Sequence, residues 1–312
     1  GDVDISSDNL TNSGVINSGN NLSITSGTID NRGQLIANNA LTILATDITS
    51  DVIYAKGDVD ISSDNLANIS VINSDGNLSI TSDMINNQGQ LIANNALTIS
   101  ATDITSDIIY ANGDVDISSD NLTNSGVINS DGNLLITSAA IDNQGQLIAN
   151  DTLTITATNI TSDIIYANGD IDILSDNLAN SGVINSENNL SITSGAIDNQ
   201  GQLIANTALT ISATDIISDI IFANGDVDIS SDNLTNSGVI NSGNNLSIES
   251  AAIDNQGQLI ANTALTISAT DIISDIIFAN GDVDISSDNL TNSGVINSDG
   301  NLLITSAAID NQ

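Results

Sequence analysis

The sequence contains no cysteine, proline, tryptophan or histidine, and only five of its 312 residues are aromatic. The absence of cysteine excludes disulfides, iron–sulfur clusters and thiolate chemistry. The absence of histidine removes the side chain used most often for general acid–base catalysis near neutral pH. No apolar run approaches the roughly 20 residues of a membrane-spanning helix. We therefore expect a protein that does not insert into membranes.

Basic residues are also nearly absent. Arg32 and Lys56 stand against 39 aspartates and glutamates, which gives a formal net charge of −37. Nucleic acids and anionic lipid surfaces are bound through clusters of Lys and Arg. The composition therefore excludes nucleic acid and anionic membrane surfaces as expected partners.

The sequence consists of one long repeat with a constant period. The segment GDVDISSDNL, once in the form GDIDILSDNL, begins at Gly1, Gly57, Gly113, Gly169, Gly225 and Gly281. Self-similarity at a fixed period is the signature of a solenoid, in which each unit packs on its neighbours. We expect residues 1–312 to form a single continuous repeat segment. Because the last period stops at Gln312, we also expect the segment to be a fragment of a much longer protein.

Each 56-residue period divides into three smaller steps. Val3 aligns with Leu22, Leu41 and Val59, so a period contains two 19-residue coils and one 18-residue coil, and the chain contains 17 coils. Short runs that alternate at period two, separated by Gly, Asn, Asp and Ser, predict three short strands in each coil, and no helical spacing occurs. The predicted fold is all-β, a right-handed parallel β-helix about 80 Å long at ~4.8 Å per coil. Leucine-rich repeats of similar length require a residue order that is missing here.

One position near the corner of each coil is always Asn or Ser. At the spacing of adjacent coils, Asn amides hydrogen-bond along the stack and satisfy backbone groups that the core leaves unpaired. We interpret this ladder as structural. Its predicted members are Asn12, Asn31, Ser50, Asn68, Asn87, Ser106, Asn124 and Asn143.

All five aromatic residues occupy one equivalent position in the repeat. If Ile53 points inward, alternation sends Tyr54 and Val52 outward. A stripe of exposed apolar side chains is a candidate contact surface. The alternative is that a loop or turn covers these side chains. The predicted stripe comprises Ile36, Val52, Tyr54, Ile92, Tyr110, Ile148, Tyr166, Phe222 and Phe278.

The aspartates are distributed so that identical positions recur only every third coil. The position of Asp4 is taken by Ser23 and Thr42 in the next two coils, which places equivalent carboxylates about 14 Å apart, beyond the Debye length of ~8 Å. We predict no cofactor. Calcium that bridges carboxylates on adjacent coils is an alternative, although the glycine-dense nonapeptide of calcium-bound β-rolls is missing. The outward Ser and Thr residues are interrupted by Asp too regularly for an ice-binding face.

Catalysis requires a group that departs from the background of the repeat and has a perturbed environment. The repeat contains no such group, so the chain is not expected to be an enzyme.

The order of residues in VDISSDNLTNSGVI and LSITSGTIDNRGQL resembles the haemagglutinin repeat of filamentous haemagglutinin and related two-partner-secretion exoproteins. The resemblance covers the whole chain and depends on repetition rather than on one motif. It implies a right-handed parallel β-helix that is exported across a Gram-negative outer membrane by a partner transporter and is secreted or held at the cell surface. Such proteins serve as adhesins, haemolysins or stalks of contact-dependent inhibition toxins. The 18-residue third coil departs from a uniform 19-residue repeat.

Three functions remain open. The first is a structural stalk that extends a distal binding or toxic domain. The second is direct adhesion, in which the stripe binds a protein receptor or glycan on a host or neighbouring cell. The third is a calcium-dependent acidic scaffold. Exposed strand edges at the ends of the segment also predict end-to-end association.

Overall fold

The structure is a computed structural model that describes all 312 residues and divides them into two compact units, Gly1–Ala157 and Thr158–Gln312. Both units contain β-strands and turns and no α-helix, so neither has a helix that could cross a membrane. β10 (Leu153–Ala167) contains the boundary between the units.

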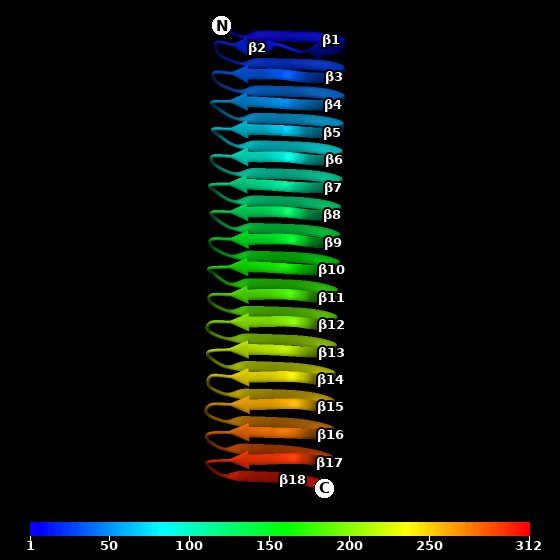
Figure 1. Cartoon of the computed structure of the whole chain (residues 1–312), viewed down its shortest axis with the longest axis vertical. Helices are drawn as coiled ribbons and strands as arrows, with labels where there is room; N and C mark the ends of the chain where they lie inside the picture. The colour runs from blue at the N-terminus through cyan, green and yellow to red at the C-terminus, as the bar shows by residue number, and fades with distance from the viewer. The chain divides into compact units, whose positions relative to one another are not determined.

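The first unit is a stack of strands in which each coil of the chain pairs in parallel with the next (Figure 1). β1 and β2 together form the first coil, and both pair with β3. Its strands are β1 (Val3–Asn12), β2 (Val15–Ser18), β3 (Leu22–Ala37), β4 (Leu41–Ala55), β5 (Val59–Ser74), β6 (Leu78–Ala93), β7 (Leu97–Ala111), β8 (Val115–Ser130), β9 (Leu134–Ala149) and the beginning of β10.

The second unit repeats this arrangement, with parallel pairing from β11 through β18. Its strands are the end of β10, β11 (Ile171–Ser186), β12 (Leu190–Ala205), β13 (Leu209–Ala223), β14 (Val227–Ser242), β15 (Leu246–Ala261), β16 (Leu265–Ala279), β17 (Val283–Ser298) and β18 (Leu302–Asn311).

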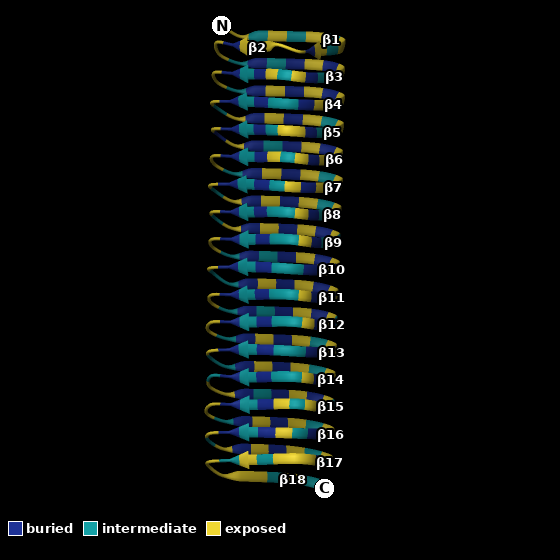
Figure 2. Cartoon of the chain, in the orientation of Figure 1, coloured by how far each residue is buried: buried dark blue, intermediate teal, exposed yellow.

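The core of each unit follows from the alternation along the strands. In β3 the side chains of Leu22, Ile24, Ile29 and Leu35 are buried, and equivalent residues stack on them in adjacent coils. Figure 2 shows this alternation of buried and exposed positions along β3 through β16. Burying one such aliphatic side chain contributes about 1.5–3 kcal/mol.

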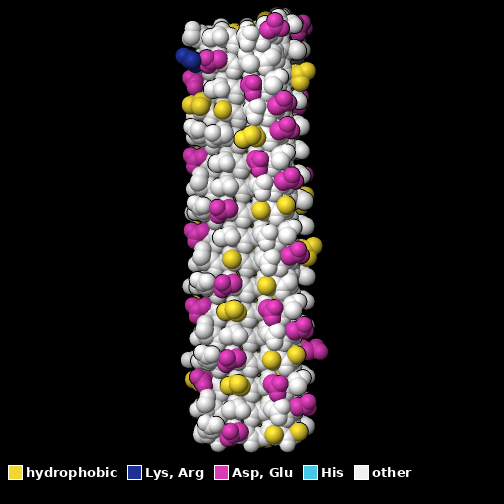
Figure 3. Space-filling view, turned by 90° about the vertical axis from the view of Figure 1, so that its right-hand side faces the viewer, with side chains coloured by type: hydrophobic (Ala, Val, Ile, Leu, Met, Phe, Trp, Pro, Cys, Tyr) yellow, Lys and Arg dark blue, Asp and Glu magenta, His cyan; other side chains and the backbone are white.

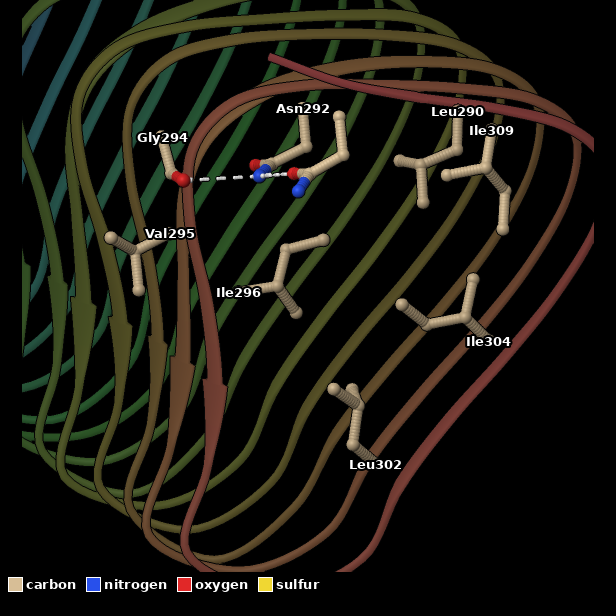
Figure 4. A pocket seen from close by; sticks show the side chains of 9 residues that line it. Leu290, Asn292, Gly294, Val295, Ile296, Leu302, Ile304 and Ile309 are labelled. Carbon is tan, nitrogen blue, oxygen red and sulfur yellow. Dashed lines mark hydrogen bonds between the residues drawn. The ribbon is translucent and has the colours of Figure 1, made fainter.

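Each coil has three walls, seen in cross-section in Figure 4 at one end of the second unit. Leu302 and Ile304 come from the first wall, Ile309 from the second, and Ile296 from the third, and all four point inward. In β3 the walls are residues 22–26, 28–31 and 34–37. Along the direction of the chain in Figure 1, each coil turns in the right-handed sense.

The predicted parallel β-helix is confirmed, with two differences in detail. A complete coil is one continuous strand, of 16 residues in β3 and 15 in β4, that bends at its corners rather than dividing into three short strands. Only the first coil is split. Pairing between β5 and β6 skips Asp64 and residues 69–70 at the bends and resumes after each of them, and no residue has a positive φ. The predicted 17 coils are present, but the last contains only β18 and is incomplete.

The 18-residue coil is shorter at one corner. Asn31 pairs with Ser50, but the next paired residues are Gln34 and Val52, so the corner of β4 has one residue fewer than that of β3. The 19-residue coils carry glycine at this corner, except that of β5, which has Ser70. A Cβ on Gly33 would lie 2.0 Å from the backbone oxygen of Gly14, so the close approach of two coils leaves no room for a side chain.

Candidate contact surface

The Asn and Ser residues of the predicted ladder are buried beside the corner of each coil. The Nδ2 of Asn68 donates to Oδ1 of Asn87 at 2.7 Å, and the Nδ2 of Asn87 donates to Oγ of Ser106 at 3.0 Å. The same amides also donate to backbone oxygens, including that of Ile108 at 2.8 Å. The side chains therefore hold the corner backbone and link three successive coils.

The ladder breaks after every serine. The Oδ1 of Asn68, one coil beyond Ser50, is buried and has no hydrogen-bond partner. The serine side chain is shorter than that of asparagine, so it does not reach the amide of the next coil. The ladder is thus a series of Asn–Asn–Ser groups. The unpartnered oxygen recurs in Asn124, Asn180, Asn236 and Asn292.

The predicted stripe lies on the outside of the third wall. In β4, Ile53 is fully buried, whereas Val52 and Tyr54 are half-buried. Tyr54 pairs with Ile36 in the preceding coil and with Asn73 in the following coil. No loop covers them, because each coil leaves only a three-residue turn outside its strand. All of the stripe residues are half-buried: Ile36, Val52, Tyr54, Ile92, Tyr110, Ile148, Tyr166, Phe222 and Phe278.

The stripe is not purely apolar. In the first unit the Val52 column continues through Val71 and Gln90, and the Tyr54 column continues through Asn73 and Ile92. Each aromatic side chain therefore has an aliphatic neighbour on one side and an asparagine on the other. The surface is suited to a ligand that makes both apolar and hydrogen-bonding contacts.

Each tyrosine of the stripe donates a hydrogen bond to an acid in the turn of the next coil. The hydroxyl of Tyr54 lies 2.6 Å from Oδ2 of Asp75. Tyr110 is bound in the same way to Asp131 at 2.8 Å. The hydroxyl of Tyr166 lies 3.4 Å from Glu187 and makes its shorter hydrogen bond, of 2.6 Å, to Oδ1 of Asn168. These pairs fix the tyrosine tips at the edge of the third wall.

The acids raise the pKa of these tyrosines. For Tyr54 and Tyr110 the largest cause of the raised pKa is the hydrogen bond to the aspartate, followed by burial and the negative charge. For Tyr166 burial raises the pKa most, and the charge of Glu187 comes second. The tyrosines therefore remain protonated, and keep their hydrogen bonds, throughout the neutral range.

A second line of carboxylates borders the other edge of the stripe. Asp107 occupies the short corner, directly before Ile108, and its Oδ1 lies 2.4 Å from where a Cβ on Gly126 would be. Glycine in the next coil therefore makes room for this carboxylate. Equivalent aspartates contact the glycine of the next coil at Asp163 and Asp219.

Other surfaces offer less chemistry. No group of three or more carboxylates is close enough to hold a metal ion. On the outside of the first wall, Asp60 lies between Thr42 and Ser79 of adjacent coils, as the spacing predicts. Figure 3 shows one side of the molecule, where acidic side chains recur among isolated hydrophobic ones. Arg32 is paired with Asp30 at 2.9 Å.

Two sets of contacts were not predicted from the sequence. Asp58 accepts hydrogen bonds from the backbone and the side chain of Asn77 at 2.7 and 3.1 Å and so caps the turn of the next coil. On the outside of the turns, Asn224 donates to Asn206 at 2.6 Å. The Asp and Asn residues that recur beside each turn are the feature of the sequence from which these contacts could have been predicted.

Comparison with known proteins identifies one family. The sequence model of the haemagglutinin repeat matches six segments that together span nearly the whole chain: residues 1–68, 52–107, 108–173, 164–219, 222–275 and 278–312. No curated protein and no solved structure matches the chain.

Proposed function

Since the chain belongs to the haemagglutinin-repeat family, we propose that it is the stalk of a bacterial exoprotein and extends a distal binding or toxic domain away from the cell. Proteins of this family are typically secreted or located at the cell surface and are structural or adhesive rather than enzymatic. A Gram-negative source and export through an outer-membrane transporter are part of the proposal.

The observation that carries this proposal is the invariance of the coils. Within each unit every coil pairs with the next in the same register, apart from the single-residue shift at the short corner. Buried Asn–Asn–Ser groups tie the corners together. A stack in which each coil contacts only its neighbours adds length without changing any local contact.

Removing one period tests the stalk. We would delete residues 57–112 from the chain displayed on a bacterial surface, with a fluorescent reporter after Gln312. Lys56 would then be followed by Gly113, which occupies the same position in the repeat as Gly57. We expect a folded protein whose reporter lies closer to a membrane dye by about 14 Å, measured by energy transfer. An unchanged distance would contradict the role as a spacer.

A second function, direct adhesion, is favoured by the half-buried columns of the third wall. We propose that these columns bind a receptor or glycan on another cell. The test replaces Tyr54, Tyr110 and Tyr166 with Ser and measures binding of the labelled chain to red blood cells. The matched control replaces three isolated exposed leucines of the first wall with Ser: Leu44, Leu135 and Leu174.

Adhesion through the stripe predicts that the tyrosine variant loses binding and the leucine variant keeps it. Both variants should retain the circular dichroism of the parent chain, because none of the six side chains belongs to the core. Equal binding by both variants would eliminate this second function and leave the stalk proposal intact.

A further inference from the structure

The stripe contains a group of side chains that recurs at every third coil. In one copy, Asp51 and Val52 lie at the short corner, Tyr54 follows on the third wall, and Asp75 follows in the turn of the next coil. We call this group the aromatic–acid cluster. Its five copies are centred on Tyr54, Tyr110, Tyr166, Phe222 and Phe278, two in the first unit and three in the second.

Four of the five clusters place carboxylates on both sides of an aromatic ring, and the Phe222 copy has Gly243 where the others carry the acid of the turn. Asp107 is held against Gly126 at one edge of the third wall, and Asp131 accepts the hydroxyl of Tyr110 at the other. The tyrosine uses one oxygen of Asp131, and Asp131 itself is exposed. An aromatic face beside carboxylates attracts a cation through the ring quadrupole and through the formal charges.

The charge of the surroundings restricts what binds there. Residues 57–112 carry seven aspartates and neither Lys nor Arg. Three coils at ~4.8 Å give one negative charge per roughly 2 Å along the stack, close to the ~1.7 Å of double-stranded DNA. A second copy of this chain, an acidic glycan or an anionic lipid would be repelled. A polycation would gain affinity by releasing counterions.

We propose that the aromatic–acid clusters bind Lys and Arg side chains of a basic protein segment. The aliphatic stem of each Lys or Arg packs on Val52 or its equivalent, and the charged head lies over the ring between the two acids. Copies within a unit are about 14 Å apart, so one segment engages several clusters and gains avidity. The inference rests on the stripe being a contact surface, which is the second proposed function.

The test measures binding of a short fluorescent poly-L-lysine, long enough to span neighbouring clusters, to the full chain by anisotropy at several salt concentrations. One variant carries Asp75→Asn, Asp131→Asn and Glu187→Gln, which neutralises three acids of the clusters. The matched control carries Asp60→Asn, Asp116→Asn and Asp172→Asn, which removes the same charge from the first wall at equivalent positions of the repeat. A third variant changes Tyr54, Tyr110, Tyr166, Phe222 and Phe278 to Leu, which keeps apolar contact and removes the rings.

We expect the cluster variant to bind poly-L-lysine at least tenfold more weakly than the parent chain, which is about the effect of losing several cation–π and charge contacts. The affinity of the control variant should fall by less than about threefold. The leucine variant should bind several-fold more weakly at unchanged net charge. Equal weakening by the cluster and control variants, or no effect of the leucine variant, would overturn the proposal. Poly-L-lysine would then be attracted by the overall negative charge of the chain rather than by the clusters.

The two proposals fail in different ways. If red-cell binding depends on the tyrosines but poly-L-lysine does not distinguish the cluster variant from its control, the stripe is adhesive and its ligand is not basic. If poly-L-lysine distinguishes them but red-cell binding ignores the tyrosines, the cationic site stands and the adhesive function fails. Circular dichroism of each variant excludes misfolding as the cause.

Discussion

Two buried asparagines, one coil apart, should differ sharply in what they contribute to stability. Asn68 and Asn87 are both buried, at 0% and 2% exposure, and belong to the same ladder group. The amide of Asn87 has a partner for its oxygen and two for its nitrogen. The amide of Asn68 donates two hydrogen bonds, but its oxygen is unpartnered. The pair is a matched comparison of a satisfied and a partly satisfied buried amide.

The expected magnitudes follow from these contacts. Asn87→Ala removes three hydrogen bonds of about 1 kcal/mol each, so unfolding should become about 3 kcal/mol easier. Asn68→Ala removes two such bonds but also removes a buried oxygen without a partner, whose desolvation costs about 1 kcal/mol or more. Its net cost should be about 1 kcal/mol. The cavity left by each substitution is the same size, so it does not affect the difference of about 2 kcal/mol.

Urea unfolding followed by far-ultraviolet circular dichroism measures this difference. The slope of the unfolding free energy against urea must stay the same in both variants, since a changed slope signals a loss of two-state behaviour. Asn199→Ala and Asn180→Ala repeat the comparison in the second unit, where the oxygen of Asn180 is the unpartnered one. Equal costs for the two positions, or a larger cost at Asn68, would refute the reasoning.

Four further predictions can be checked directly. Gly33→Ala should lower stability by about 1–3 kcal/mol because its Cβ would overlap the backbone of Gly14, whereas Gly14→Ala, with nothing within 4 Å, should be nearly neutral in the same urea assay. Because the pKa of Tyr54 is raised in the folded state, its hydrogen bond to Asp75 stabilises the fold fully below pH ~10 and is lost as the pH rises through the folded-state pKa. Ultraviolet titration should show one tyrosine ionising at a lower pH in the Asp75→Asn variant than in the parent chain. A chelator should leave the thermal midpoint unchanged if the acids are simply solvated, and a fall would support the calcium-dependent scaffold. Light scattering should show association of this segment that increases with concentration, since Leu302 and Ile309 are about half exposed at the end of the second unit, and a concentration-independent monomer would contradict it.

Most of the fold was predictable because the repeat supplies its own alignment. The spacing that matched Val3 to Leu22, Leu41 and Val59 is the pairing register of the strands. The extent of each strand was not predictable from alternation alone. The strands continue through the bends at Gly27 and the short corner, although the alternation of side chains is interrupted there and the paired residues skip these positions.

The candidate site was predictable only in part. Alternation around Ile53 correctly indicates the outward direction of Tyr54, but its partner Asp75 lies 21 residues later in a turn. The break between Ser50 and Asn68 depends on the reach of a serine side chain across one coil. Both features are set by distances between neighbouring coils, which residue type and spacing do not specify.

The recurrence of neighbours after three coils also bears on how such a chain changes length. Asp4 stacks on Ser23, Ser23 on Thr42, and Thr42 on Asp60. Loss of two coils would place Asp4 directly against Asp60, with two carboxylates about 5 Å apart. Loss of one whole period leaves the order of residues in this column as it was. Loss or gain of whole periods therefore avoids stacked carboxylates, so we expect heritable variation in the length of such chains to come in whole periods.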